Sequence, residues 1–268
     1  MLKDITLGQY FPGDSFIHRL DPRTKLLMVV VYIVALFMAS GWLAYGLVIA
    51  FLGLCIKISG IPVKSITRGM KPGLVIVILT GLLNLFFTPG THEIFTIFGF
   101  TLTWEAVERA AQMILRIMLL ITGTFLLTYT TSPIALTDGL ESLLTPLKKI
   151  KFPVHELSMM MCIALRFIPT LIEETDKIMS AQKARGADFE SGILMQKAKA
   201  LIPILVPLFI SAFRRADELA TAMECRCYHG GEGRTRLRQL KYQGIDRITL
   251  LLFVAVTVLV GVLGHFGL

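Results

Sequence analysis

Long runs of apolar residues dominate the first half of the chain. Residues 26–56 form a run of 31 positions without a charged side chain, whereas one membrane-spanning helix needs only about 20 residues. Lysines and arginines flank this run at both ends, and basic residues stay on the cytoplasmic side of a membrane. Both ends are therefore expected on that side, so the run predicts two short spans that turn near residues 40–41.

Residues 73–87 and 110–130 are two further apolar runs, and they predict the third and fourth spans. Pro72 precedes the third, where proline suits the first turn of a helix. The loop between them, residues 88–104, contains no lysine or arginine, which indicates the outer face of the membrane. Its β-branched and aromatic residues allow a short hairpin or an interfacial segment.

Arg116 is the one charged residue in the apolar part of the fourth span. An arginine at the centre of a spanning helix costs roughly 2.5–3.5 kcal/mol on insertion scales. We expect its side chain to face a helix interior or to extend toward the membrane surface, since either arrangement reduces that cost. A contact with the path of a solute is the alternative.

The character of the sequence changes after the fourth span. Residues 131–247 contain 17 of the 27 lysines and arginines, which indicates a cytoplasmic location, yet long apolar stretches continue. Ser132 and Pro133 are typical of a helix start. Residues 155–185 and 194–226 then predict two long helices, which are expected to bend at their internal prolines.

These elements together predict an all-α, polytopic integral membrane protein. About five transmembrane helices are expected, with residues 248–264 as the last, and three cytoplasmic helices lie between the fourth and fifth spans. The corresponding regions are 1–131 with four spans, 132–245 as a cytoplasmic and interfacial region, and 246–268 as a C-terminal transmembrane helix. The N-terminus is predicted to be cytoplasmic, and the cell membrane is the expected location of this multi-pass protein.

Composition supports this assignment and narrows the function. Hydrophobic residues make up 54% of the chain and charged residues 17%, against roughly 25% charged residues in an average soluble domain. The formal net charge of +8 is explained by the orientation of the spans. Nucleic-acid binding requires basic and aromatic residues interleaved on a soluble face, and the sequence has no such stretch, so no nucleic-acid partner is expected.

The sequence lacks the motifs of common enzymes. A phosphate-binding GxxxxGK[ST] motif is absent, so we do not expect this chain to bind or hydrolyse ATP. The apolar centres of the predicted spans contain no Asp or Glu, which ion-coupled carriers normally use. Cys225 and Cys227 have only His229 close by, too few ligands for a zinc site. We therefore predict a non-catalytic chain that binds no metal and no cofactor of its own.

The two long predicted helices end in the same pattern, an arginine between two small residues. The triplets are Ala184, Arg185 and Gly186 in the first, and Cys225, Arg226 and Cys227 in the second. A cation near a helix C-terminus is mildly favourable by itself, which explains either arginine taken alone. The pair indicates more, because small neighbours let another backbone approach, and the planar guanidinium can bind a carboxylate or carbonyl groups. We predict that both tips dock into another polypeptide, which supplies the motor activity that this chain lacks.

A cluster of soft side chains lies in the first long helix. Met159, Met160, Met161 and Cys162 are consecutive, and methionine-rich surfaces repack readily against different partners. Contact with lipid or with the protein core is the alternative explanation. We predict that these four residues form a contact with a membrane partner.

Five blocks of the sequence, in this order, resemble the transmembrane T component, EcfT, of energy-coupling factor transporters. They are HRLDPRTKLL at 18–27, SPIALTDGLESLLTPLKKI at 132–150, ALRFIPTL at 164–171, AQKARG at 181–186 and AMECRCY at 222–228. The resemblance extends nearly from end to end. It implies a scaffold and coupling subunit of an ATP-driven importer that takes up vitamins or transition-metal ions.

In that family, two ABC-type ATPase subunits bind ATP and Mg²⁺ and drive a small membrane S component, which binds the solute. The resemblance implies that the three cytoplasmic helices are coupling helices, and that residues 184–186 and 225–227 dock into grooves of the two ATPases. The membrane partner of residues 159–162 would be the S component. The cysteines beside Arg226 depart from the family, in which Ala-Arg-Gly or Ala-Arg-Ser is more frequent. The groove for this tip is therefore expected to differ if the two ATPases are not identical.

A self-contained secondary carrier or channel for a small solute is the alternative function. It predicts solute flux into liposomes that contain this chain alone. The sequence argues against it, because the predicted spans lack acidic residues and no internal repeat is visible.

Overall fold

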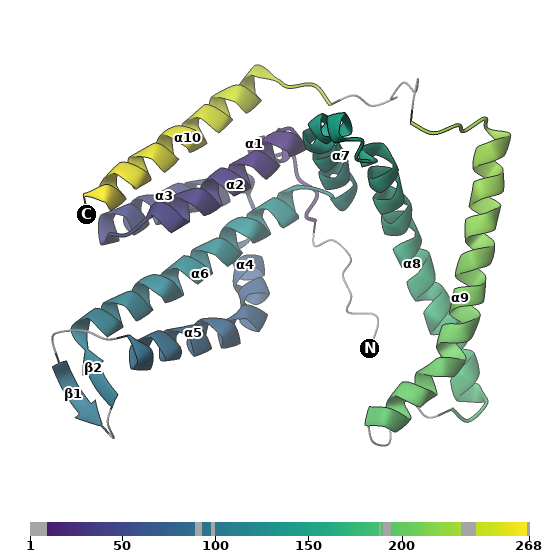
Figure 1. Cartoon of the computed structure of the whole chain (residues 1–268), viewed down its shortest axis with the longest axis horizontal. Helices are drawn as coiled ribbons and strands as arrows, with labels where there is room; N and C mark the ends of the chain where they lie inside the picture. The colour runs from purple at the N-terminus through teal and green to yellow at the C-terminus, as the bar shows by residue number, and fades with distance from the viewer. Residues whose placement is uncertain are drawn as a thin grey trace. The chain divides into compact units, whose positions relative to one another are not determined.

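The structure is a computed structural model that describes residues 10–88, 93–97, 100–187, 189, 194–231 and 240–266. Helices form most of this structure, as Figure 1 shows. The elements are α1 Phe16–Arg19, α2 Pro22–Met38, α3 Trp42–Ser59, α4 Val63–Met70, α5 Leu74–Phe87, β1 Glu93–Ile97, β2 Phe100–Thr103, α6 Trp104–Thr130, α7 Pro133–Leu144, α8 Val154–Ala184, α9 Leu194–Cys225 and α10 Gly244–His265. Short 3₁₀ helices at Lys71–Gly73 and Thr145–Ile150 precede α5 and α8. The predicted all-α class is confirmed.

One small hairpin interrupts the helices, in the loop predicted on the outer face. Strands β1 and β2 pair antiparallel, with Glu93 opposite Thr103 and Ile97 opposite Phe100. The hairpin was one of the two arrangements expected there. It leads directly into α6, where the Thr103 hydroxyl accepts a hydrogen bond from the Ala106 N–H at 3.3 Å.

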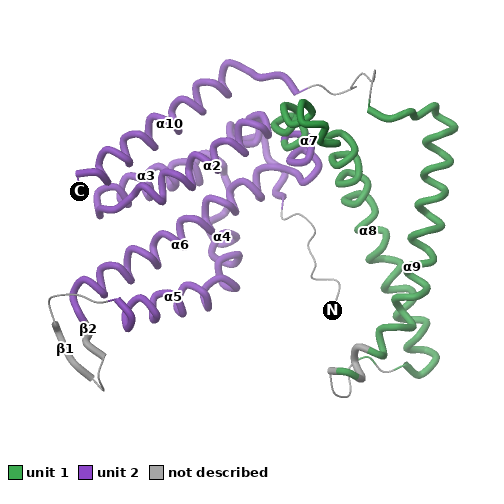
Figure 2. The backbone as a smooth tube through the Cα atoms, in the orientation of Figure 1, with its two compact units in different colours: residues 1–7, 140–239 green, residues 8–139, 240–268 purple. Residues whose placement is uncertain are grey.

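Contacts between residues divide the chain into two compact units, which Figure 2 shows in different colours. We call residues 8–139 with 240–268 the core unit; it contains α1 to α6 and α10. We call residues 1–7 with 140–239 the arm unit; it contains α8 and α9, and α7 crosses the border. The predicted borders at residues 131/132 and 245/246 concern the membrane, so they stay predictions.

In the core unit, residues 26–56 form two helices, as their flanking charges predict. α2 ends at Met38, and the next residue, Ala39, is extended, with φ −70° and ψ 118°. Gly41 is also extended and begins α3. Leu36, Ala39, Ala44 and Tyr45 around this turn are completely buried, so the turn is part of the core.

Helices α2, α3, α6 and α10 share one apolar core, to which they contribute Tyr32, Tyr45, Leu119 and Val260 among others. α6 lies close to α2 at Gly123, where a Cβ atom would lie 2.3 Å from Cε1 of Tyr32. Any side chain here would therefore push the two helices apart. The Tyr32 hydroxyl donates a hydrogen bond to the Leu119 carbonyl at 2.8 Å, which satisfies the one polar atom of this buried ring.

Arg116 of α6 faces the protein interior, as one of the two expected arrangements requires. Its Nε donates to the Tyr45 hydroxyl at 3.0 Å, and its Nη2 donates to the Ala39 carbonyl at 3.0 Å. The guanidinium also lies over the rings of Tyr45 and Phe37, a favourable position for a cation. Arg116 therefore ties α6 to the turn between α2 and α3.

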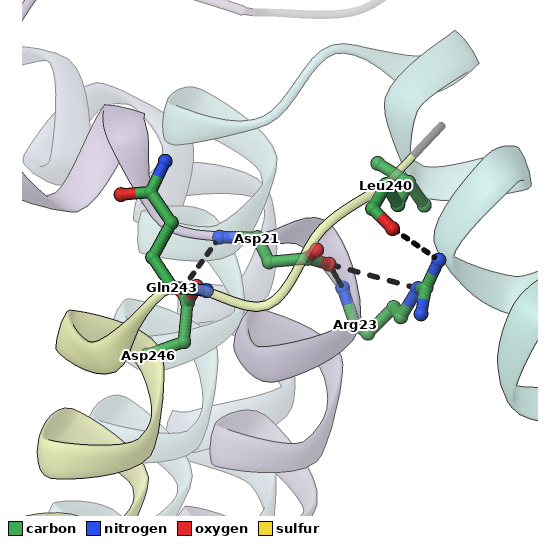
Figure 3. Close-up of polar contacts among 5 residues, drawn as sticks. All are labelled: Asp21, Arg23, Leu240, Gln243 and Asp246. Atoms are coloured by element: carbon green, nitrogen blue, oxygen red, sulfur yellow. Dashed lines mark hydrogen bonds and ion pairs between the residues drawn. The ribbon is translucent and has the colours of Figure 1, made fainter. Parts of the chain in front are cut away.

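A polar cluster joins the start of α2 to the start of α10 (Figure 3). The buried Asp246 carboxylate accepts hydrogen bonds from the N–H groups of Asp21 at 2.9 Å and Gln243 at 2.8 Å. The Asp21 carboxylate accepts from the Arg23 N–H at 2.9 Å, and Arg23 donates through Nη2 to the Leu240 carbonyl at 3.3 Å. Asp21 and Asp246, 225 residues apart in sequence, are thus held together.

Lys25 is buried near this cluster, in the first turn of α2. Its Nζ donates to the carbonyls of His18 at 3.3 Å and Thr130 at 2.9 Å, and to the Thr131 hydroxyl at 3.1 Å. These three acceptors use all three donors of the ammonium group. Lys25 therefore fastens the end of α6 to the start of α2.

Within the described residues, five helical segments are long and apolar enough to cross a membrane, namely α3, α4 with α5, α6, α8 and α10. Five spans were also predicted from the sequence, but the two sets differ: α8 replaces α2 among the candidate helices. α2 has 17 residues, about 26 Å of helix, against a hydrocarbon core of about 30 Å. α8, predicted on the cytoplasmic side, qualifies by length and composition with 31 residues. The protein is a multi-pass membrane protein on either assignment.

In the arm unit, α8 and α9 have 31 and 32 residues and pack against each other. Their ends lie within one residue of the predicted helices 155–185 and 194–226. A hydrogen bond of 3.1 Å between Nδ1 of His155 and the Glu141 carboxylate joins the last part of α7 to the start of α8.

α9 carries an exposed stripe of large apolar side chains along the middle of the helix. The stripe consists of Leu201, Ile202, Leu205, Val206, Phe209, Ile210 and Phe213. Spacings of three and four residues place such side chains on one face of a helix. Within the part of the chain that the structure describes, this face remains uncovered, so it is suited to contact lipid or another protein.

Candidate docking site at two helix ends

The first predicted tip closes α8 with a left-handed turn. α8 ends at Ala184, and the Arg185 N–H donates to the carbonyls of Ala181 at 3.3 Å and Gln182 at 3.1 Å. Gly186 has φ +88°, and the Ala187 N–H donates back to the Gln182 carbonyl at 3.0 Å. Many helices end in this way, with one residue in the left-handed conformation and a backbone hydrogen bond from the next N–H to the carbonyl five positions earlier. Glycine is favoured at the left-handed position.

The second predicted tip closes α9 in the same way. Arg226 follows the last helical residue, and its N–H donates to the Met223 carbonyl at 3.1 Å. Cys227 has φ +58°, and the Tyr228 N–H donates to the Met223 carbonyl at 3.0 Å. The two arginines therefore hold equivalent positions, one residue before the left-handed residue and two before the closing N–H.

The tips differ at the left-handed residue. Glycine adopts this conformation freely at position 186, whereas the Cβ atom of Cys227 makes it unfavourable by roughly 1–2 kcal/mol. Strain of this kind is found at functional sites when the surrounding structure maintains it. From the sequence, Cys227 was expected only to be a small neighbour of Arg226. Cys227 follows Arg226 as Gly186 follows Arg185, and this shared position was the signal for its left-handed conformation.

All six tip residues are exposed to solvent. Among the residues that the structure describes, neither guanidinium takes part in a hydrogen bond or an ion pair. Burial of either arginine inside its own unit would have contradicted the docking prediction. The geometry instead leaves two planar cations at helix ends, with small side chains on both sides of each.

The predicted contact at residues 159–162 lies elsewhere on α8. Met160 and Met161 are exposed by 55% and 37%, whereas Met159 and Cys162 are half-buried. Consecutive residues point about 100° apart on a helix, so the four side chains do not share one face. Residue 161 precedes Arg185 by 24 positions, about 36 Å of helix. The structure thus separates this cluster from the first tip.

Among the described residues, no group of three His, Cys, Asp or Glu side chains lies close enough together to hold a metal ion. Cys225 and Cys227 are exposed on the tip, and Cys55 is buried in the core unit. The expectation that the chain binds no cofactor stays a prediction.

One polar contact between the two long helices was not predicted from the sequence. The Glu174 carboxylate of α8 accepts a hydrogen bond from the Ser211 hydroxyl of α9 and pairs with Arg215 Nη2 at 3.1 Å. The sequence contains a signal for it: Glu174 lies 11 residues before Arg185, and Arg215 lies 11 residues before Arg226. The pattern around the tips is therefore longer than the triplets themselves.

Comparison with known proteins gives a consistent result. Residues 13–237 match the family described as CbiQ, cobalt transport protein. Relatives named energy-coupling factor transporter transmembrane protein EcfT include that of Clostridium kluyveri, 56% identical over 252 residues, covering 94% of this chain and 93% of the relative. The EcfT of Acidaminococcus fermentans is 54% identical over 266 residues, 98% of each chain, and that of Ruminiclostridium cellulolyticum is 53% identical over 247 residues, 92% of each. The family match includes both tips.

Proposed function

Because the chain belongs to the CbiQ family and is an EcfT-type transmembrane component of an energy-coupling factor transporter, we propose that it couples two ATPases to a solute-binding subunit. The ATPases are ABC-type subunits, and the solute-binding subunit is a membrane S component. Vitamins or transition-metal ions are the proposed solutes, recognised by the S component. The chain itself is a non-catalytic scaffold that transmits motion.

The equivalence of the two helix ends carries this proposal. Each long helix of the arm unit presents an exposed arginine at the same position of the same C-terminal turn. A guanidinium of this kind can enter a groove and bind a carboxylate or several carbonyls through its fork of donors. Two equivalent tips suit two equivalent partners, so each tip is proposed to hold one ATPase.

The proposed orientation follows from the charges of the arm unit. Residues 131–247 hold 17 of the 27 basic residues, and such an excess marks the cytoplasmic side. In the cell membrane, both tips and the N-terminus would then lie in the cytoplasm, where ATP is available. ATP and Mg²⁺ would be bound by the ATPases, because this sequence lacks a phosphate-binding loop.

The S component is proposed to contact apolar surface of the arms. Met160 and Met161 offer exposed, adaptable side chains on α8, and such side chains accommodate more than one partner. Met159 and Cys162 would support this surface from their half-buried positions.

The decisive experiment removes both tip arginines. Arg185→Ala and Arg226→Ala should each weaken ATPase binding by about 30-fold, since loss of one partner from a desolvated charge contact costs 2 kcal/mol or more. The effects should multiply in the double variant, because the tips bind separate partners. Co-purification of the ATPases with a tagged copy of this chain, followed by mass spectrometry, measures binding.

Lys183→Ala and Arg214→Ala are the matched controls, because each removes a cation from the same helix and leaves both tip arginines in place. Both should retain the ATPases at the level of the unchanged chain. A double tip variant that still recovers the ATPases at full stoichiometry would contradict the proposed function. ATP-driven uptake that persists undiminished in that variant would contradict it equally.

A further inference from the structure

We propose that Glu174 and Arg215, supported by Ser211, form the pivot at which the two long helices turn against each other. The pivot is proposed to pass a displacement of the tips to the apolar halves of α8 and α9. This inference rests on the proposed function, because it requires that the tips be moved by the ATPases. Glu174, Ser211 and Arg215 are positioning residues and contact neither ATP nor solute.

The contacts at the pivot come from one carboxylate. Glu174 accepts through Oε1 from the Ser211 hydroxyl and pairs through Oε2 with Arg215 Nη2 at 3.1 Å. The Arg215 guanidinium also lies 6.0 Å from the ring centre of Phe167, which precedes Glu174 by seven residues, about two helical turns. Glu174 and Arg215 side chains are 23% and 33% exposed, and Ser211 is buried. Partial burial makes this ion pair stronger than one on an open surface.

The pivot lies at the same distance from both tips. Eleven residues separate Glu174 from Arg185, and eleven separate Arg215 from Arg226, which corresponds to about 16 Å along each helix. Eleven residues also make close to three complete turns, so each arginine returns to nearly the face that carries the pivot contact. A lever with equal arms and aligned faces moves both tips by similar amounts.

Helix stiffness differs on the two sides of the pivot. Residues 174–184 and 215–225, between pivot and tips, contain no proline and no glycine. All three internal prolines lie on the other side: Pro169 in α8, and Pro203 and Pro207 in α9. A proline removes one helical hydrogen bond and permits bending there. The tip segments are therefore stiff, and bending is concentrated in the apolar halves.

The pivot also marks a change of surface. The exposed apolar stripe of α9 ends at Phe213, two residues before Arg215, and charged residues become frequent from residue 214 onward. In α8, charged residues likewise become frequent from Glu173 onward. Motion of the polar tips is thus converted at the pivot into motion of the apolar surfaces. Without the pivot, the helices would slide, and the tips would move without the apolar halves.

The test measures both halves of the lever in the complete transporter complex, purified with its ATPases and S component. Spin-labelled amino acids are incorporated at Gln182 and Thr221 for the tip pair, and at Ala164 and Leu205 for the apolar pair. Pulsed electron paramagnetic resonance gives each distance before and after addition of a non-hydrolysable ATP analogue with Mg²⁺. In the unchanged chain, both distances should shift.

In Glu174→Gln and in Arg215→Gln, the tip pair should still shift, and the shift of the apolar pair should be lost. Glu173→Gln and Arg214→Gln are matched controls, because each removes the same charge one position away, and both should behave as the unchanged chain. The exchanged pair, Glu174→Arg with Arg215→Glu, should restore the shift of the apolar pair. If a single variant fails to assemble, the exchanged pair still tests the pivot, because it keeps one positive and one negative side chain at the contact.

Four outcomes would overturn the pivot. An apolar pair that shifts normally in Glu174→Gln would do so, as would control variants that lose the shift equally. Failure of the exchanged pair to restore assembly and the shift is the third. If the tip pair of the unchanged complex does not respond to nucleotide, the proposed function itself is wrong. A response of the tips without any response of the apolar pair refutes the pivot alone.

Discussion

The core unit and the arm unit hold their helices in different ways. In the core unit, charged side chains reach between helices and place their polar atoms against backbone groups, as Lys25, Arg116 and Asp246 do. The buried side chains described in the arm unit are Glu141, Val154, Ser158, Ile204 and Ser211, while α9 exposes an apolar stripe. The core unit is therefore fixed by its own contacts, and the arm unit is shaped to receive contacts from other molecules.

Truncation of an aromatic side chain should show the largest difference in stability loss between the core unit and the arm unit. Tyr45→Ala should lower the free energy of unfolding by about 3–5 kcal/mol, because it opens a cavity in the core and removes the hydroxyl that accepts from Arg116. Phe209→Ala in the α9 stripe should change it by less than about 0.5 kcal/mol. Thermal unfolding of both variants in detergent measures the difference, and equal losses would mean that the arm unit has a core of its own.

Removal of a buried cation should have the next largest effect. Lys25→Met should lower the free energy of unfolding by about 2–3 kcal/mol, since buried carbonyls lose their donor. These are the carbonyls of His18 and Thr130. Lys177→Met, at an exposed position of α8, is the matched control and should be nearly neutral. A Lys25 variant as stable as this control would show that water replaces the ammonium group without loss.

The smallest expected effect concerns the difference between the tips. Cys227→Gly should stabilise the closing turn of α9 by about 1 kcal/mol, because glycine adopts a positive φ without strain. Gly186→Cys should destabilise the turn of α8 by a similar amount. Hydrogen exchange of the Tyr228 and Ala187 amides reports each turn separately. Unchanged exchange in both variants would indicate that the left-handed conformation is not strained by a side chain.

Local signals account for the parts of the fold that the sequence predicts well. The ends of α8 and α9 are marked by the arginine triplets at 184–186 and 225–227, so they were placed within one residue. The turn between α2 and α3 was predicted from charges that flank residues 26–56 and was confirmed. In each case, the decisive residues lie at or next to the ends of the segment that they delimit.

Contacts across the fold were beyond prediction from one sequence. The pattern placed Arg116 inside a span, but not its partners Tyr45 and Ala39, which are 71 and 77 positions earlier. Apolar composition fits both a spanning helix and a helix that presents an apolar face to a partner, so it could not decide between these two for α8. Cysteine is an unusual residue for a left-handed helix end, which concealed the conformation of Cys227.

The carboxylate of Asp246 has a consequence for the order in which the protein is made. It accepts the amide hydrogens of Asp21 and Gln243, so the beginning of α2 receives this partner only after the ribosome has synthesised nearly the whole polypeptide. Until then, the Asp21 N–H at the start of α2 lacks its carboxylate acceptor. A nascent chain arrested before residue 246 should therefore remain accessible to protease near Asp21, and completion of α10 should close that site.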